Sequence, residues 1–432
     1  MTHSAAAATA PAAFSELSKK LTKSLSKEEK KNGGIFFTPP ACVVDIMSRL
    51  RVFELSFETI LEPSCGSGEF ISALVREYPR ANITGVEYNH DIYSEVSQHF
   101  SAVTNVQIHH SDFLTYTCTD RAPDLIIGNP PYYVMKKEDV APEYYPFFDG
   151  RPNIFILFII KSAKLLREGG VLCFVLPSSF MNSQYYDKTR KYIVRHFTIL
   201  HIAKCDNGGG YLETQQETFV LMIQKRAPTT PTPTTSGGGG SGGSGGVFEK
   251  SGATIFTFNL PRLAELYAGS RSLYELGFKV SVGTVVWNQC KDILTNDGTK
   301  TRLIYSSNIE DGKFVHKTYK NTEKKAFIDK PGGGAPMIVL NRGYGMGEYK
   351  FDYCLITPES VSSQEYLIEN HLICITLADA DTDTDAATPI AEFQRIIRSF
   401  QDSRTREFIA CYCANNAMNT TELNHMLPIY DI

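Results

Sequence analysis

The sequence predicts an α/β protein with a doubly wound, mostly parallel sheet, followed by a smaller α+β domain. Three observations predict this. Short apolar runs alternate with amphipathic helical patterns from Pro40 to Lys225, polar loops follow the carboxyl ends of several runs, and the alternation stops at a low-complexity stretch, 227–250. Alternating strands and helices form parallel sheets, which bind ligands at the carboxyl ends of their strands.

The expected strands are short and rich in branched apolar residues, as buried parallel strands are. They cover residues 59–63, 83–87, 106–109, 124–128, 171–176, 198–203 and 217–225. Helical patterns between them include 153–166 and 185–196. One interpretation makes residues 254–258 the returning strand of the last hairpin of this sheet.

Length and composition suggest the domain boundaries. The 432 residues are enough for two domains, each with its own core. We expect a disordered, basic tail at 1–31, a first domain at 32–260 and a second domain at 261–432. The Thr-Pro and Gly-Ser stretch at 227–250 is a flexible linker or loop, and the sequence fits a natural or an engineered one equally.

Cysteine usage and hydropathy limit the class of protein. No run of about 18 apolar residues is free of charge, so we expect no membrane span. The ten cysteines form no Cys-x-x-Cys pairs, so we expect neither a zinc site nor a disulfide framework. We expect no other bound metal either. This favours a reducing compartment, the cytoplasm or the nucleus.

Charge is distributed unevenly along the chain, although its net value is only −4. Residues 261–350 carry 14 Lys and Arg against 9 Asp and Glu, whereas residues 359–392 carry eight acids and no Lys or Arg. A basic face is therefore expected despite the acidic total. The acidic run 379–385 imitates a calcium loop but has Thr384 at the sixth position, where glycine is needed, so we interpret it as a solvated loop.

A glycine loop follows the first expected strand. Residues 60–70 read Ile-Leu-Glu-Pro-Ser-Cys-Gly-Ser-Gly-Glu-Phe and lead into a helical pattern. Gly66 and Gly68 allow a ligand to approach the backbone at the start of a helix. A dinucleotide site would continue to a third glycine or alanine, but Ile71 stands there, which argues against NAD or FAD.

Acidic residues follow the next two expected strands. Glu87 ends one of them, 19 positions after Gly68, where a carboxylate commonly binds ribose hydroxyls. Asp112 and Phe113 follow the other, and together suit an adenine amine and ring. Three strand ends with these groups favour a nucleoside cofactor.

The fourth strand, 124–128, leads into the tetrapeptide Asn129-Pro130-Pro131-Tyr132. Two successive prolines fix their φ angles and lack N–H groups, so the Pro130 carbonyl is held as an acceptor without a donor beside it. Asn129 adds a second acceptor, and Tyr132 adds a flat ring. Such a site can bind both hydrogens of an exocyclic amine while the base stacks on the ring, as methylation of adenine requires.

These motifs resemble the gamma class of amino-methylating DNA methyltransferases, which act on adenine N6. In that family a Thr-Pro element, a glycine motif, the Asn-Pro-Pro-Tyr motif and a target-recognition domain follow one another. All four occur here in that order, and the Thr-Pro element is the segment 34–40. The match covers residues 32–226 and is looser beyond them. It implies the class I methyltransferase fold, S-adenosylmethionine as cofactor, base flipping, double-stranded DNA as substrate, and a restriction endonuclease as a separate partner.

The resemblance also implies residue roles. Two aromatic rings are expected to stack on the target base, Tyr132 and Tyr211, with Phe219 as the alternative to Tyr211. The residues expected to bind the cofactor are Thr38 at its carboxylate, Glu62 and Ser64 at its methionine part, Gly66 and Gly68 in the loop, Glu87 and Tyr88 at its ribose, and Asp112 and Phe113 at its adenine.

The second domain offers one candidate DNA contact, the glycine loop 341–345, in which Arg342 and Tyr344 supply a cation and a ring. Three other functions stay open. Methylation of RNA adenine is one. Protein-glutamine methyltransferases share the tetrapeptide but lack the Thr-Pro element and the large second domain. An inactive DNA-binding subunit would not need the intact tetrapeptide.

Overall fold

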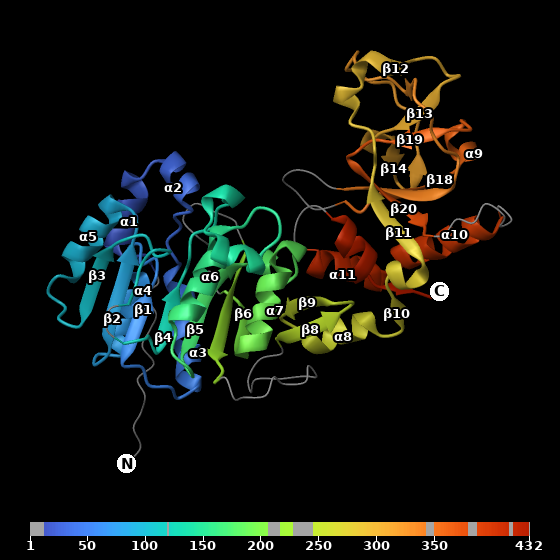
Figure 1. Cartoon of the computed structure of the whole chain (residues 1–432). Coiled ribbons are helices and arrows are strands. Elements are labelled where there is room, and N and C mark those ends of the chain that lie inside the picture. The colour runs from blue at the N-terminus through green and yellow to red at the C-terminus, as the bar shows by residue number, and fades with distance from the viewer. Residues whose placement is uncertain are drawn as a thin grey trace. The chain divides into compact units, whose positions relative to one another are not determined.

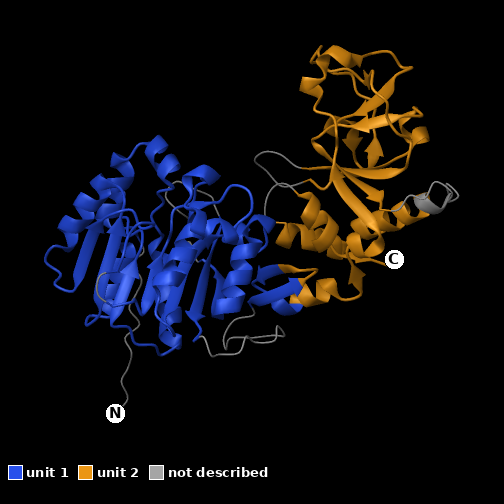
Figure 2. Cartoon of the chain, viewed as in Figure 1, with its two compact units in different colours: residues 1–249, 254–261 blue, residues 250–253, 262–432 orange. Residues whose placement is uncertain are grey.

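The computed structural model describes residues 13–118, 121–205, 217–227, 245–342, 350–378, 387–413 and 418–431. The chain forms two compact units, shown in Figure 2. Unit 1 comprises residues 1–249 and 254–261, and unit 2 comprises residues 250–253 and 262–432. All residues after Pro261 therefore belong to unit 2.

Unit 1 contains a seven-stranded sheet with the strand order β3-β2-β1-β4-β5-β7-β6. Strand β7 runs antiparallel to both of its neighbours, and the strands from β3 to β5 are parallel (Figure 1). This is the class I methyltransferase arrangement expected from the sequence. The strands are β1 (Thr59–Glu62), β2 (Asn82–Glu87), β3 (Val106–His110), β4 (Leu125–Gly128), β5 (Val171–Pro177), β6 (Phe197–Lys204) and β7 (Thr218–Lys225).

Helices cover both faces of this sheet. They are α3 (Pro40–Val52), α4 (Glu69–Glu77), α5 (His90–Phe100), α6 (Ile154–Leu165) and α7 (Asp187–His196). Side chains of α3, α4 and α5 share one apolar cluster, and those of α6 and α7 share another. Strand β4 shows why: Leu125 and Ile127 belong to the first cluster and Ile126 to the second, because successive side chains of a strand point to opposite faces.

The N-terminal segment differs from the expected tail. Helix α1 (Glu16–Ser24) lies within residues 1–31 and helix α2 (Lys27–Gly33) begins there, and Leu21 and Leu25 of this segment are buried against Ile92 of α5. Ser18 is fully buried and donates a hydrogen bond of 2.7 Å to Ser67 in the glycine loop. The domain therefore begins earlier than residue 32, because apolar residues at helical spacing lie among the lysines.

Two further expectations need correction. The segment 254–258 does not return to the main sheet: β9 (Ala253–Thr257) pairs with β8 (Gly246–Lys250) in a separate two-stranded sheet. The expectation of no disulfide is also wrong, since Cys42 of α3 is bonded to Cys205 after β6, with their Cα atoms 5.6 Å apart. The two residues are 163 positions apart, so only the fold brings them together.

Unit 2 is built mainly of short strands. One sheet has the order β11-β20-β17-β18 and another the order β12-β16-β13-β19. Its elements are α8 (Leu260–Tyr267, which starts in unit 1), β10 (Ser270–Arg271), β11 (Phe278–Val282), β12 (Leu294–Thr295), β13 (Thr301–Ile304), β14 (Ile309–Glu310), β15 (Lys313–Phe314), β16 (Phe327–Ile328), β17 (Met337–Asn341), β18 (Tyr353–Ile356), α9 (Pro358–Val361), β19 (Tyr366–Ile368), β20 (Leu372–Leu377), α10 (Ala387–Gln401), α11 (Ser403–Tyr412) and β21 (Ile429–Tyr430).

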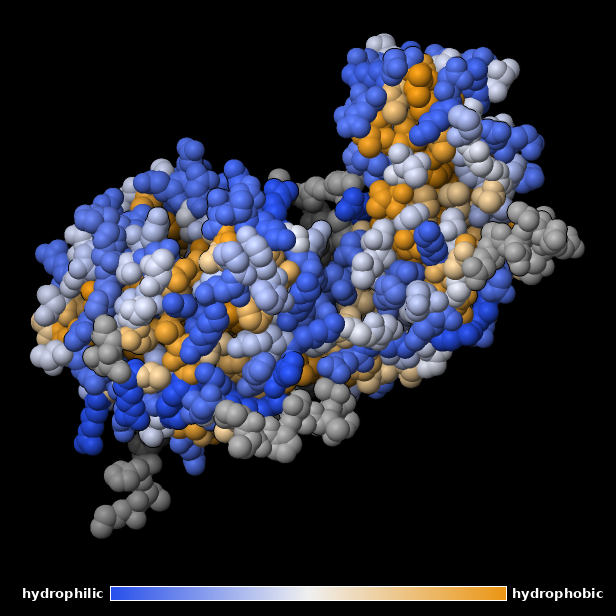
Figure 3. Space-filling model, viewed as in Figure 1, coloured by the Kyte–Doolittle hydropathy of each residue, from blue (hydrophilic) through white to orange (hydrophobic). Residues whose placement is uncertain are grey.

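On the face of unit 1 drawn in Figure 3, hydrophobic residues form separate patches between hydrophilic ones. Within the described parts of the chain, no helix has the length and hydropathy needed to cross a membrane. The acidic run at 379–385 lies outside the described residues.

Candidate active site

Two loops meet at the carboxyl edge of the main sheet. Strands β1 and β4 are parallel neighbours, with Ile60 opposite Leu125. The glycine loop after β1 and the tetrapeptide after β4 therefore leave the sheet side by side. The Ser64 hydroxyl donates a hydrogen bond of 3.1 Å to the Asn129 carbonyl and so connects the two loops directly.

The side chain of Asn129 is held in one orientation. Its amide nitrogen donates to the Phe36 carbonyl at 3.2 Å, and its amide oxygen accepts a hydrogen bond from the Tyr132 hydroxyl. The Val175 carbonyl lies 2.7 Å from the same hydroxyl, so the two acceptors share its single proton. These contacts fix which end of the amide is the acceptor. The Pro130 carbonyl has no hydrogen-bond partner among the described residues, although Pro130 is buried.

The Thr-Pro segment packs directly against the tetrapeptide. Gly34 has a φ of 61°, and a β-carbon added to it would lie 2.7 Å from the backbone nitrogen of Tyr132. Only glycine permits both this backbone conformation and this close approach. Thr38 is buried four residues further on. The structure thus brings the Thr-Pro segment, the glycine loop and the tetrapeptide to one place.

Two buried carboxylates lie behind the glycine loop. Glu87 is 8% exposed and accepts hydrogen bonds from the backbone nitrogens of Gly66 at 2.9 Å and Asn89 at 2.8 Å. Burial is the largest effect on its pKa and raises it despite these hydrogen bonds. Glu62 is 2% exposed; burial, then the nearby Glu87 charge, raises its pKa well above the usual value.

One oxygen of this pair marks a ligand position. Glu62 Oε2 is buried and has no hydrogen-bond partner among the described residues. A buried polar atom of this kind is costly unless a ligand satisfies it, and a carboxylate favours a cation. The amino group and the sulfonium of S-adenosylmethionine are both cationic. The buried carboxylates present therefore fit a cofactor with these charges.

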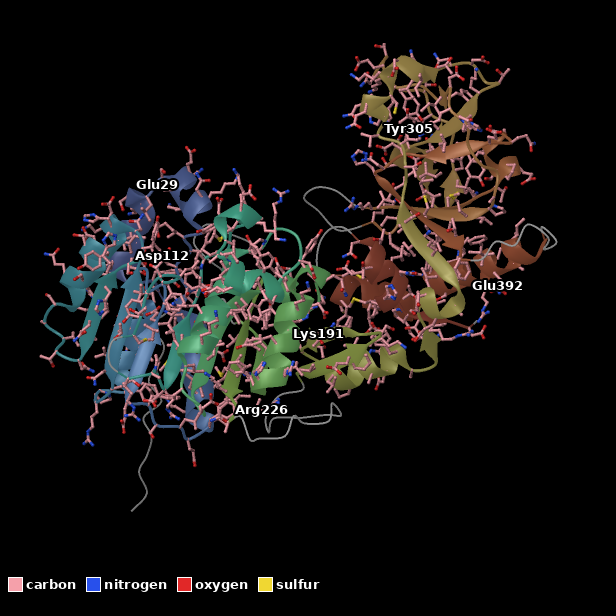
Figure 4. All side chains as sticks on the ribbon, viewed as in Figure 1. Glu29, Asp112, Lys191, Arg226, Tyr305 and Glu392 are labelled. Atoms are coloured by element: carbon pink, nitrogen blue, oxygen red, sulfur yellow. A yellow bond between two sulfur atoms is a disulfide. The ribbon has the colours of Figure 1, made fainter. Side chains whose placement is uncertain are left out.

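The loops after β2 and β3 complete this edge. Tyr88 is 76% exposed, and Asp112 is exposed with one oxygen accepting from the Leu114 nitrogen at 2.9 Å. In Figure 4 Asp112 lies on the same side of unit 1 as Glu29, whereas Arg226, after β7, lies at the opposite side. Phe113, expected at the adenine of the cofactor, is buried in the core and packs against Phe158 with ring centroids 4.9 Å apart, so its ring has no exposed face in this structure.

The remaining expected residues have different outcomes. Tyr211 and Tyr344 lie outside the described residues. Phe219, the alternative to Tyr211, is fully buried in β7 and stacks on Phe180, so it offers no free face to a base. Arg342 belongs to unit 2, where its backbone nitrogen donates to the His371 carbonyl, and its guanidinium has no partner among the described residues.

Three site residues were missed by sequence reasoning. Phe36 and Val175 act through backbone carbonyls, which no side-chain pattern reveals. Tyr133 is half-buried, and burial first, then the charges of Asp112 and Tyr88, raises its pKa. Its place directly after the tetrapeptide was the available signal for a second ring at this edge of the sheet.

Comparisons with known proteins agree with this geometry. The family model described as Eco57I restriction-modification methylase matches residues 44–209. The chain is 30% identical over 425 residues to the type II methyltransferase M.CvrRI of Paramecium bursaria Chlorella virus XZ-6E, covering 96% of this chain and 99% of that protein. It is 36% identical over 190 residues to the modification methylase CviBIII of Chlorella virus NC1A, which covers 42% of this chain and 47% of that protein.

Solved structures include a putative class I S-adenosylmethionine-dependent methyltransferase from Listeria monocytogenes, with 17% identity and a TM-score of 0.42 over 50% of this chain and 68% of that chain. The type IIG restriction endonuclease BpuSI covers 96% of this chain and 60% of its own, with 11% identity and a TM-score of 0.44. The match to M.CvrRI, by contrast, runs through both units of the chain and nearly the full length of the relative. The chain therefore belongs to the type II DNA methyltransferases of restriction-modification systems, which are S-adenosylmethionine-dependent enzymes.

Proposed function

We propose that the protein methylates the N6 amine of adenine in double-stranded DNA, at a specific site, after turning the target nucleotide out of the helix. The observation that carries this proposal is the pair of acceptors after β4. Asn129 Oδ1 is oriented by its neighbours, and the adjacent Pro130 carbonyl has no partner among the described residues. Two fixed neutral acceptors match the two hydrogens of an exocyclic amine.

The chemistry needs these acceptors because the nitrogen lone pair of an adenine amine is delocalised into the ring. Hydrogen bonds from the amine to Asn129 and Pro130 favour a pyramidal nitrogen and direct its lone pair toward the methyl donor. S-adenosylmethionine supplies an electrophilic methyl group on a positively charged sulfur. Glu62 and Glu87, on the neighbouring β1 and β2, would hold the cofactor in place for in-line transfer.

Tyr132 would support the base after it leaves the helix. Its hydroxyl is fixed by Asn129 and Val175, and its ring meets Phe155 edge-on, with centroids 6.0 Å apart. A ring fixed in this way can stack on a base without losing much side-chain entropy. Flipping costs a few kcal/mol in duplex DNA, and stacking offsets part of this cost.

Unit 2 would recognise the DNA sequence. Its described strands and helices provide a scaffold separate from the methyl-transfer site, and Arg342 lies at the end of β17. Any restriction endonuclease that cuts the same site would be a separate protein.

Methylation with labelled S-adenosylmethionine tests the proposal. Plasmid DNA, matched RNA and glutamine-containing protein are offered, and the modified nucleosides are separated after digestion. We expect N6-methyladenine in DNA. Label at cytosine N4 or in RNA would correct the substrate, and label only in protein glutamine would refute the proposal.

A further inference from the structure

An apolar side chain stands exposed directly after the catalytic tetrapeptide. Val134 is 61% exposed, whereas Tyr132, Tyr133 and Met135 around it are all partly buried. Single exposed apolar residues are common on protein surfaces, so exposure alone says little. The position of Val134 is informative, because two residues of chain place it within about 7 Å of Tyr132.

The backbone holds Val134 in this exposed position. Val134 forms an isolated antiparallel β-bridge with Asn153. On either side of it, the Met135 nitrogen donates to the Pro152 carbonyl at 2.8 Å, and the Ile154 nitrogen donates to the Tyr133 carbonyl at 2.9 Å. Ile154 is the first residue of the buried helix α6, so this short ladder is anchored to the core. The valine therefore cannot turn inward without breaking these bonds.

Two cations lie beside the valine, both two residues further along the ladder. Continuing the register of the bridge places Lys136 opposite Arg151, and both side chains are exposed. Neither forms an ion pair within the described part of the chain. Like charges opposite one another are destabilising unless an anion lies between or beside them. The acidic residues Glu138 and Asp139 follow, in a short turn of 3-10 helix.

We propose that Val134 enters the DNA base stack where the target nucleotide leaves it, and that Lys136 and Arg151 bind the phosphates beside that nucleotide. This inference rests on the proposed function, since it requires base flipping. Removing a base leaves an apolar gap between its former neighbours, and apolar side chains are known to fill such gaps in bent or opened DNA. Val134 is thus a positioning residue: it stabilises the flipped state and does not touch the reacting atoms.

The main test compares Val134→Ala with Val134→Leu and with a matched control, Val52→Ala. Val52 is 69% exposed at the end of α3, which leads into the amino end of β1, so it lies at the opposite edge of the sheet. Single-turnover methylation is measured on a duplex with a normal A·T target and on one in which the target adenine is mispaired. Flipping is measured with 2-aminopurine at the target position.

We expect Val134→Ala to lower methylation of the A·T duplex about tenfold and to reduce the 2-aminopurine signal, because opening a paired base costs a few kcal/mol. On the mispaired target the loss should shrink to about twofold, because less opening energy is required. Val134→Leu should restore the rate, while Val52→Ala and the cofactor affinity of all variants should not change. Equal losses on both duplexes, or no loss on either, would overturn the role of Val134.

The phosphate contacts have their own test. The double variant Lys136→Gln, Arg151→Gln should weaken DNA binding of every sequence and reduce the slope of log K against log salt by about 2, one for each lost contact. An unchanged slope would show that these two residues do not contact DNA phosphates. If the wild-type protein methylates no adenine in DNA, the proposed function itself fails; if it does and the variants match it, only this inference fails.

Discussion

Replacing Asn129 by alanine separates the chemistry of this protein from its binding functions. The substitution removes the amide that accepts from the Tyr132 hydroxyl and donates to the Phe36 carbonyl. It keeps the Asn129 backbone carbonyl, so the hydrogen bond from Ser64 at 3.1 Å remains. It also leaves Glu62 and Glu87 untouched. The cofactor site should therefore stay intact while one of the two acceptors for the amine is lost.

The expected magnitudes differ for rate and stability. Loss of one oriented hydrogen bond at a reacting centre typically lowers the rate about 10²- to 10³-fold, or about 2.7 to 4 kcal/mol. The Phe36 carbonyl and the Tyr132 hydroxyl each lose a partner, but the hydroxyl keeps Val175 at 2.7 Å. We therefore expect a loss of about 1 to 3 kcal/mol in the free energy of unfolding.

The assay combines single-turnover methyl transfer, calorimetry of cofactor binding and denaturant unfolding. Asn105→Ala is the matched control: Asn105 donates to the Ala81 carbonyl at 2.8 Å and lies just before β3, away from the carboxyl edge. It should lose similar stability and keep the full rate. If Asn129→Ala transfers methyl groups at the wild-type rate, or loses rate only in proportion to cofactor affinity, the proposed mechanism is wrong.

Four further outcomes are expected. Tyr132→Ala should reduce flipping, seen as weaker 2-aminopurine fluorescence, by removing stacking of about 1 to 3 kcal/mol, while Tyr132→Phe should keep most of the signal. Glu87→Ala should weaken cofactor binding by roughly 1.5 to 3 kcal/mol in calorimetry, and unchanged affinity would count against its role. The pKa of Glu62 is raised above the usual value of 4.5, so the ligand-free protein should lose stability as pH rises above about 4.5 toward the folded-state pKa. The variant Glu62→Gln should show a flatter dependence of stability on pH and weaker cofactor binding. A pH profile identical to that of the wild type would contradict this role of Glu62. Arg342→Gln should alter site choice if Arg342 contacts a base, or weaken binding to all sequences if it contacts phosphate, and no effect on either would exclude it from the DNA surface.

The sequence predicted the main sheet well because its strands are buried on both faces. Strand β4 has four fully apolar or glycine positions in a row, and β5 is buried along its whole length. Such runs indicate strands that are covered on both faces, and the amphipathic helices between them imply parallel crossovers. The N-terminal helices were harder to predict, because their few buried residues are hidden among lysines. The Cys42–Cys205 bond depends on the tertiary fold alone.

The candidate site divides in the same way. Motifs that are local in sequence, the glycine loop and the tetrapeptide, were recognised from their residue types and from the strands before them. The contacts between segments that are distant in the sequence were not predicted. The amide of Asn129 is oriented by Phe36, which is 93 residues away, and the Tyr132 hydroxyl by Val175, which is 43 residues away, both through backbone carbonyls. Backbone acceptors carry no sequence signature, so such partners emerge only when the strands are assembled.

The buried carboxylates connect the stability of the protein with its choice of cofactor. Burial raises the pKa of both acids, and the Glu87 charge raises that of Glu62 further, so their ionisation destabilises the folded state. A neutral hydrogen-bond donor would satisfy Glu62 Oε2, whereas a cation would also attract the ionised carboxylate and so favour its ionisation more strongly. S-adenosylmethionine carries one positive charge on its amino group and another on the sulfur that donates the methyl group, and S-adenosylhomocysteine keeps only the first. If Glu62 faces the sulfonium, the protein should bind the donor more tightly than the product, and calorimetry with both ligands on the wild type and Glu62→Gln tests this.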